Sequence, residues 1–99
     1  MQGPSQKSEY IGGELKSATL AGTASAAVLG TEEASLVKIL ADATTAGTLY
    51  WGGNNVSTDN GFPLAAGAQT EWIPVRSLSD VKYIGSNGSQ TGRIVYVQR

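Results

Sequence analysis

Residues 81–98 have the sequence VKYIGSNGSQTGRIVYVQ, in which two short runs rich in β-branched and aromatic residues flank the dipeptide Asn87-Gly88. Runs of this composition are typical of β-strands, and Asn-Gly favours the positive φ values of a type I′ turn. The stretch therefore predicts two antiparallel strands, 81–85 and 92–98, joined as a hairpin.

Five further runs of the same kind precede this stretch. The expected strands are 19–29, 35–41, 48–52, 62–64 and 69–75. Turn-forming residues separate them, as Gly and Asn do in the segment 52–55. No window keeps the i, i+3, i+4, i+7 spacing of a helix for more than one turn. About seven short strands without a βαβ crossover predict an all-β fold: a single small antiparallel β-sandwich of jelly-roll or immunoglobulin-like type.

Two of the expected strands are apolar on both faces, because side chains alternate between the faces of a strand. The alternating sets are Ile94 and Tyr96 against Val95 and Val97, and Val37 and Ile39 against Leu36 and Leu40. One face of each strand can line the core. The other face needs cover from a loop, from a second copy or from a larger partner.

A chain of 99 residues holds one domain. Its segment 1–15 contains Pro4 and three glycines and has no strand pattern, so we expect a flexible N-terminal arm over 1–15 and the sandwich domain over 16–99. Tyr10 and Ile11 form the arm's only hydrophobic pair. Such an arm either stays loose or becomes ordered against a partner, where extended backbone can add to a sheet edge.

The composition excludes several classes of function. The chain has no cysteine and no histidine, which removes a disulfide framework, the thiolate ligands of a structural zinc site and the side chain best suited to proton transfer near neutral pH. Seven basic and eight acidic residues give a net charge of −1, and the basic residues are spread evenly rather than in a stripe for phosphate backbones. We expect no enzymatic activity, no cofactor, no metal and no nucleic-acid partner. We also expect no signal peptide or membrane span, and synthesis in the cytoplasm.

The polar residues that remain are most simply parts of turns. Ser77, Ser79 and Asp80 are close in sequence but form a polar turn leading into a strand, and no catalytic residue is assigned. Calcium ligation, the alternative for Asp42, Asp59, Asn60 and Asp80, matches no known loop spacing. The aromatic residues Tyr50, Trp51, Trp72 and Tyr83 are either core residues or a platform for stacking sugars.

Four motifs carry a resemblance to a known kind of protein. They are VKILAD at 37–42, AGTLYWGG at 46–53, GFPL at 61–64 and LSDVKYIG at 78–85, followed by a closing apolar strand. In this order and spacing they resemble small β-sandwich virion proteins of tailed bacteriophages, of the capsid decoration or cement type. The resemblance covers residues 36–97, about two thirds of the chain.

The resemblance implies a structural virion protein that binds the capsid lattice and stabilises the phage head without catalysis. Its partner would be the major capsid protein, its location the capsid surface of the virion, and its own state a homo-oligomer, with a trimer favoured by the local three-fold positions of a capsid. The expected partner-contact residues are Tyr10, Ile11, Leu15, Trp51 and Phe62. The alternatives are a collar, tail or head-fibre component and a carbohydrate-binding β-sandwich.

Overall fold

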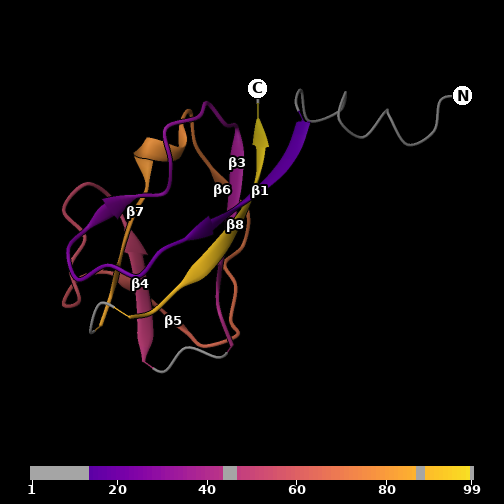
Figure 1. Ribbon diagram of the computed structural model, residues 1–99. Helices are drawn as coiled ribbons and strands as arrows, with labels where there is room; N and C mark the ends of the chain where they lie inside the picture. The colour runs from indigo at the N-terminus through magenta and orange to yellow at the C-terminus, as the bar shows by residue number, and fades with distance from the viewer. Residues whose placement is uncertain (1–13, 44–46, 87–88, 99) are drawn as a thin grey trace, which may run out of the picture.

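The computed structural model describes residues 14–43, 47–86 and 89–98. It is an antiparallel β-sandwich of two four-stranded sheets (Figure 1). The elements are β1 (Glu14–Leu20), β2 (Ala27–Val28), β3 (Leu36–Ala41), β4 (Thr48–Gly52), β5 (Phe62–Ala65), β6 (Ile73–Pro74), the 3-10 turn η1 (Leu78–Asp80), β7 (Lys82–Gly85) and β8 (Gly92–Gln98). The predicted all-β sandwich is confirmed.

Each sheet mixes strands from both halves of the chain. The first sheet has the order β1-β8-β3-β6, and the second has the order β2-β7-β4-β5. The strand pairs within both sheets are antiparallel. In Figure 1 the first sheet lies on the right and the second on the left, so the chain crosses between the sheets several times.

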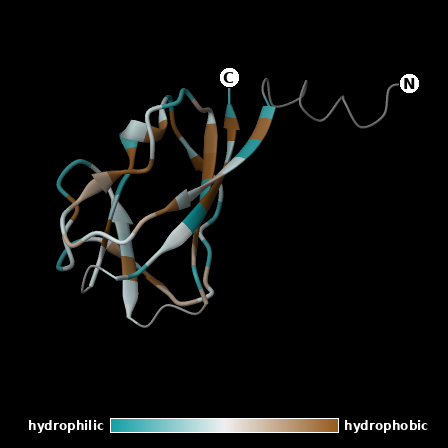
Figure 2. Ribbon diagram, viewed as in Figure 1, coloured by the Kyte–Doolittle hydropathy of each residue, from teal (hydrophilic) through white to brown (hydrophobic). Residues whose placement is uncertain are grey.

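The core lies between the sheets and uses one face of each strand. Figure 2 shows β3 in the hydrophobic colour along most of its length. Its buried side chains include Val37, Ile39, Ile94 and Tyr96 from the first sheet and Leu49, Leu64 and Tyr83 from the second. Burial of this apolar surface is the main term that favours folding. As expected, one apolar face of β3 and one of β8 line the core, and these are the faces of Val37 and Ile39 and of Ile94 and Tyr96.

The opposite face of the first sheet is only partly covered. Leu36, Lys38 and Leu40 of β3 are half-buried, and Arg93 and Val95 of β8 are exposed. Their register places Lys38 opposite Val95 and Leu40 opposite Arg93. We call this surface the outer face. It corresponds to the second apolar face that the sequence left in need of cover.

The predicted hairpin between the last two strands is wrong. β7 pairs with β2 and β4 in the second sheet, whereas β8 pairs with β1 and β3 in the first. The two strands contribute to the same core from opposite sides, with Tyr83 buried on β7 and Ile94 buried on β8. The segment 86–91 therefore connects strands of different sheets instead of neighbouring strands of one sheet.

The N-terminal strands also differ from the prediction. The expected strand 19–29 is two strands in different sheets, β1 and β2. β1 begins at Glu14, so Glu14 and Leu15, expected in the arm, belong to the sandwich; residues 1–13 lie outside the described residues. Six of the seven β1 residues are exposed, so the strand has no alternating apolar pattern that could reveal it. Backbone pairing with β8 over its whole length defines it instead.

The expected strand 69–75 is also shorter in the structure, where it is reduced to β6. Only Ile73 and Pro74 are paired as a strand. Thr70 interrupts the ladder because its hydroxyl, rather than a strand carbonyl, accepts the Ile39 amide at 3.0 Å.

Candidate functional site

The serine and aspartate group at 77–80 caps the 3-10 turn. The Ser77 hydroxyl accepts the Ser79 amide at 3.2 Å, and the Asp80 carboxylate accepts the amides of Arg76 at 2.9 Å and Ser77 at 3.2 Å. This reciprocal arrangement is a capping box. It confirms the predicted polar turn, and its oxygen atoms serve backbone amides.

The residues considered for calcium are held in separate places. Thr91 donates its hydroxyl to Asp42 at 2.7 Å, and Arg93 Nε lies 3.5 Å from the same carboxylate. Asn60 Oδ1 accepts the Ser57 amide at 2.8 Å in a different loop. Within the described residues no group of three or more acidic, histidine or cysteine side chains is placed to hold a metal ion. The same part of the chain contains no helix long and apolar enough to cross a membrane.

The aromatic residues divide between core and surface. Tyr83 is buried and donates its hydroxyl to the Ala21 carbonyl at 2.7 Å. Burial raises the pKa of the Tyr83 phenol above its ordinary value. Tyr83 is therefore a core residue that ties β7 to the segment after β1, and it is not part of a sugar platform.

Trp51, Phe62 and Trp72 meet in a groove between β5 and β6. The rings of Trp51 and Phe62 lie 4.9 Å apart with an interplanar angle of 33°. Phe62 is 61% exposed and Trp72 is 40% exposed. The groove has a volume of about 490 Å³, and we call it the aromatic groove. It brings together two of the predicted contact residues, Trp51 and Phe62, which are adjacent across the β4–β5 pair.

The chemistry of the aromatic groove is apolar stacking with one charge. Glu71 is the ionisable residue among its lining residues, which also include Pro63 and Pro74. The Lys38 ammonium lies 5.2 Å from the centre of the Trp72 ring, a cation–π contact made from the outer face. The groove can therefore hold a flat apolar ligand face, and it has few groups for hydrogen bonding.

A second candidate surface is the free edge of β1, at the opposite end of the first sheet from β6. The direction of its backbone groups follows from the ladder. Asp42 donates its amide to the Thr91 carbonyl at 3.1 Å, and hydrogen-bonded pairs recur at every second residue of an antiparallel pair. Odd-numbered residues of β8 from Thr91 onward therefore face β3, and the even-numbered residues face β1.

The same alternation continues into β1. Lys16 and Ala18 lie opposite the even-numbered Tyr96 and Ile94, so their amides and carbonyls bond to β8. The residues between and beside them, Leu15, Ser17 and Thr19, direct their amides and carbonyls away from β8. Within the described residues no strand pairs with that side of β1. We call it the β1 edge.

The other three sheet edges are short or blocked. β2 and β6 have two residues each, and β5 has four. Ser86 donates to the Thr48 carbonyl at 3.0 Å, so every second β4 residue from Thr48 faces β7. Pro63 lies opposite Tyr50, one of those residues, and its nitrogen therefore faces the free side of β5. A proline at that position removes the donor that a further strand would need.

The same device protects the edge at β6. Val75 donates its amide to the Ser35 carbonyl at 3.0 Å, so Val75 faces β3. Pro74 is the next residue and lies opposite Leu36, which faces β8, so the nitrogen of Pro74 points to the free side. Natural sheets use short edges and edge prolines to prevent pairing with other chains. The β1 edge, seven residues long and without proline, lacks both.

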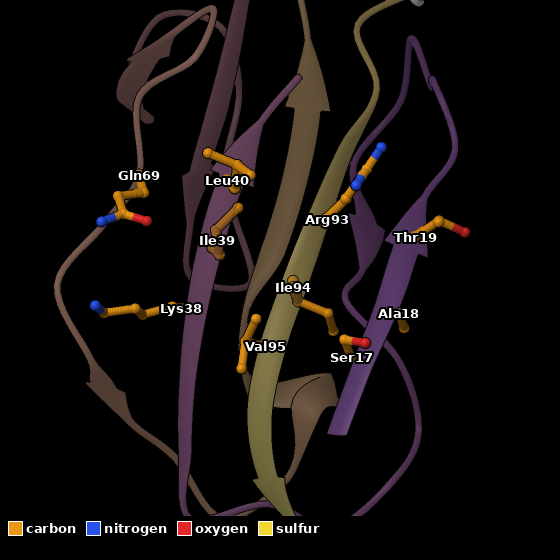
Figure 3. A pocket seen from close by; sticks show the side chains of 10 residues that line it. All are labelled: Ser17, Ala18, Thr19, Lys38, Ile39, Leu40, Gln69, Arg93, Ile94 and Val95. Atoms are coloured by element: carbon orange, nitrogen blue, oxygen red, sulfur yellow. The ribbon is translucent and has the colours of Figure 1, made fainter. Parts of the chain in front are cut away.

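A shallow groove on the outer face runs beside the β1 edge (Figure 3). Its volume is about 490 Å³, and β1, β8 and β3 lie side by side in its floor. Ser17 and Thr19 lie at the β1 side, opposite Val95 and Arg93. The residues that line it are Ser17, Ala18, Thr19, Lys38, Ile39, Leu40, Gln69, Arg93, Ile94 and Val95.

The predicted contact residues fall into three groups. Trp51 and Phe62 share the aromatic groove, Leu15 lies 60% exposed on β1, and Tyr10 and Ile11 are outside the described residues. A role in partner contact stays a prediction for these residues. Ser17 and Thr19 were not singled out from the sequence, because small polar residues in a strand exposed on both faces carry no hydrophobic signal.

Comparison with known proteins identifies the fold. No protein-family model matches the sequence, and no curated protein matches it. The fold is similar to that of a solved chain described in the words "Bacillus endospore appendages form a novel family of disulfide-linked pili", with a TM-score of 0.51, 17% sequence identity and 87% of each chain covered. At this identity the likeness shows a shared β-fold.

Proposed function

We propose that this chain is a structural subunit of a repeating protein assembly, without catalytic activity, and that the β1 edge forms one of its contacts with other chains. The observation that carries the proposal is the contrast between this edge and the other three. A long edge strand whose outward amides and carbonyls are not blocked by proline is suited to pairing with another chain. Repetition over many copies makes even weak contacts of this kind effective.

The assembly that we favour is a phage head. The sequence motifs at 37–42, 46–53, 61–64 and 78–85 resemble capsid decoration proteins, so the proposed partner is the major capsid protein and the proposed location is the virion surface. A collar, tail or head-fibre position is the nearest alternative. A pilus-like fibre is another, because the structural neighbour is described as a pilus protein.

The absence of cysteine supports attachment through backbone pairing and apolar contact. The structural neighbour belongs to pili described as disulfide-linked, whereas this chain has no cysteine in its sequence. Subunits of this chain cannot be joined by disulfides, so the proposed assembly depends on non-covalent contacts. The β1 edge and the adjacent outer face supply both hydrogen-bonding groups and apolar surface.

The test is binding of the purified full chain to phage heads that lack it, followed by cryo-electron microscopy of the particles. We expect density for the sandwich at regular positions on the head. Heads that stay bare would contradict capsid decoration. Regular fibres formed by the chain alone would favour the pilus-like alternative, and chains found only on the tail or collar would move the proposed position.

Carbohydrate binding is a second candidate because the aromatic groove exposes Phe62 and Trp72. Aromatic faces stack on sugar rings, and Glu71 would accept hydroxyl hydrogen bonds. A glycan array on the purified chain tests this candidate, with the Trp72→Ala variant as the control. Binding that disappears in the variant would support it, and an array without hits would contradict it.

A further inference from the structure

We propose that two copies of this chain pair through their β1 edges about a two-fold axis at Ser17. The inference rests on the proposed function, in which the β1 edge is one of the contact surfaces, and it names the occupant of that edge. The paired strands would join the two first sheets into one continuous sheet. The argument comes from which edges can act as partners and from the register that they allow.

None of the other described edge strands, β2, β5 and β6, is a suitable partner for the β1 edge. The β2 edge offers two residues, Pro63 removes one of the two outward donors of β5, and Pro74 removes the outward donor of β6. Among the described edges only β1 has consecutive outward-facing groups to match those of β1 in a second copy. Two copies of one edge meet antiparallel about a two-fold axis, which gives a closed dimer rather than an open fibre.

The register follows from the outward-facing residues. With Ser17 on the axis, Leu15 lies opposite Thr19 of the second copy, and Ser17 lies opposite its own equivalent. Leu15, Ser17 and Thr19 would then each donate one amide and accept through one carbonyl, so the strand pairs along its described length. This register places Glu14 opposite Leu20 and Lys16 opposite Ala18, so no like charges are directly opposed.

The strand has room for a second copy. Six of its residues are exposed, so neither sheet of its own sandwich covers it. The side chains of Leu15, Ser17 and Thr19 share the face of their β8 partners Val97, Val95 and Arg93. In the dimer the outer-face grooves of the two copies would therefore lie on the same side of the joined sheet. The three-copy state expected from capsid symmetry is a different arrangement, and the experiment distinguishes the two.

Charge substitution at the axis tests the pairing. Ser17→Lys places two ammonium groups opposite each other in the dimer, and Ser17→Asp places two carboxylates. At the roughly 5.5 Å between directly opposed residues, each variant alone should dimerise roughly fivefold more weakly at low ionic strength. An equimolar mixture should recover association as a mixed dimer. Native mass spectrometry separates the mixed dimer from both homodimers by mass.

The matched control places the same charges away from the edge. Asn54 is exposed in the loop after β4, so Asn54→Lys and Asn54→Asp should dimerise as the wild type does and mix in statistical proportions. Circular dichroism melting of the four variants confirms that each is folded. Ser17→Pro is a second probe, because it removes an outward amide without entering the β8 ladder, and it should abolish the dimer.

The expected result is a wild-type dimer, weakened homodimers of both Ser17 variants and an excess of the mixed Ser17 dimer over the statistical half. A wild-type monomer at high micromolar concentration, a wild-type trimer, or Ser17 mixtures that match the Asn54 mixtures would overturn the inference. A monomer that still binds phage heads would overturn the β1–β1 pairing and leave the proposed function intact. A dimer that binds no repeating assembly would overturn the proposed function and leave the pairing intact.

Discussion

The two ends of the first sheet differ in the chemistry of their backbone. At the β6 end the strand has two residues, and Pro74 removes the outward amide. At the β1 end seven residues pair with β8, no other strand among the described residues pairs with their second side, and Leu15, Ser17 and Thr19 turn amides and carbonyls outward. The pattern of apolar side chains determines which residues form the core, whereas strand length and the position of proline determine which edge of a sheet can pair with a further strand.

The sheet ends also differ in their dependence on the core. The β6 end adjoins the aromatic groove, where Trp51 packs against the core cluster. In β1 only Leu20 is buried, so the strand is held mainly by its ladder with β8. Substitutions in the core, in the ladder and at the outward positions should therefore have effects of decreasing size.

The largest effect is expected in the core strand β3. Ile39→Asp places an unpaired charge at a fully buried position, which costs several kcal/mol, comparable with the whole stability of a small domain. We expect no folded protein by circular dichroism. Lys38→Asp, on the adjacent outer-face residue, should fold and lose about 1 kcal/mol with the Trp72 contact. Equal melting temperatures for the two variants would show that the assignment of faces is wrong.

A proline pair separates the two sides of β1. Ala18→Pro removes an amide that bonds to β8 and leaves the Ile94 carbonyl without its donor, so the free energy of unfolding should fall by about 2 kcal/mol. Ser17→Pro removes an outward amide and should cost less than about 1 kcal/mol. Urea unfolding of both variants measures the difference. The reverse order would mean that the assigned directions of the β1 amides are exchanged.

A smaller effect is expected where the end of β1 is tied to the second sheet. Tyr83→Phe removes the hydrogen bond to the Ala21 carbonyl and should cost about 1 kcal/mol at neutral pH. Because burial raises the pKa of Tyr83 above 10.0, the unfolded chain loses the phenol proton first. Stability due to this residue is therefore present below about pH 10 and is lost as the pH rises further. Thermal melts from pH 8 to 11 should show a smaller alkaline loss in Tyr83→Phe, and identical pH profiles would exclude this coupling.

The smallest effect on stability is expected from unblocking β5. Pro63→Thr restores an outward amide on an exposed edge strand and should change the free energy of unfolding by less than about 0.5 kcal/mol. It should nevertheless increase self-association in size-exclusion chromatography, because the free side of β5 then has a donor at position 63 as well as at Ala65. Ala65→Thr introduces the same side chain at another outward position and restores no donor. Association that rises equally in both variants would indicate a side-chain effect.

The sequence predicted the parts of the fold that depend on alternating apolar residues. That one face of β3 and one of β8 would line the core was expected, and the structure shows that Val37, Ile39, Ile94 and Tyr96 occupy those faces. The predicted hairpin was wrong because an Asn-Gly dipeptide favours a local turn type and does not specify which sheet each neighbouring strand joins. β1 was largely missed because ELKSATL is exposed on both faces, so its pairing depends on backbone groups that every residue has.

The candidate surfaces were predictable to different degrees. Trp51 and Phe62 were singled out as large apolar residues, and they do share an exposed groove. Leu15, Ser17 and Thr19 direct their amides and carbonyls outward because hydrogen-bonded residues alternate along β8 and β1. The alternation is counted from the hydrogen bond between Asp42 and Thr91. This alternation can be assigned only when the strand order and the register are known, and residue types alone do not give either.

Amide exchange in β1, measured by NMR at low and high protein concentration, tests the central claim most directly. Lys16 and Ala18, bonded to β8, should be protected at both concentrations. Leu15, Ser17 and Thr19 should exchange rapidly in dilute protein and become protected as the concentration rises and the edge is occupied. Outward amides that exchange at the same rate at every concentration, while the protein associates, would contradict the account and place the contact elsewhere.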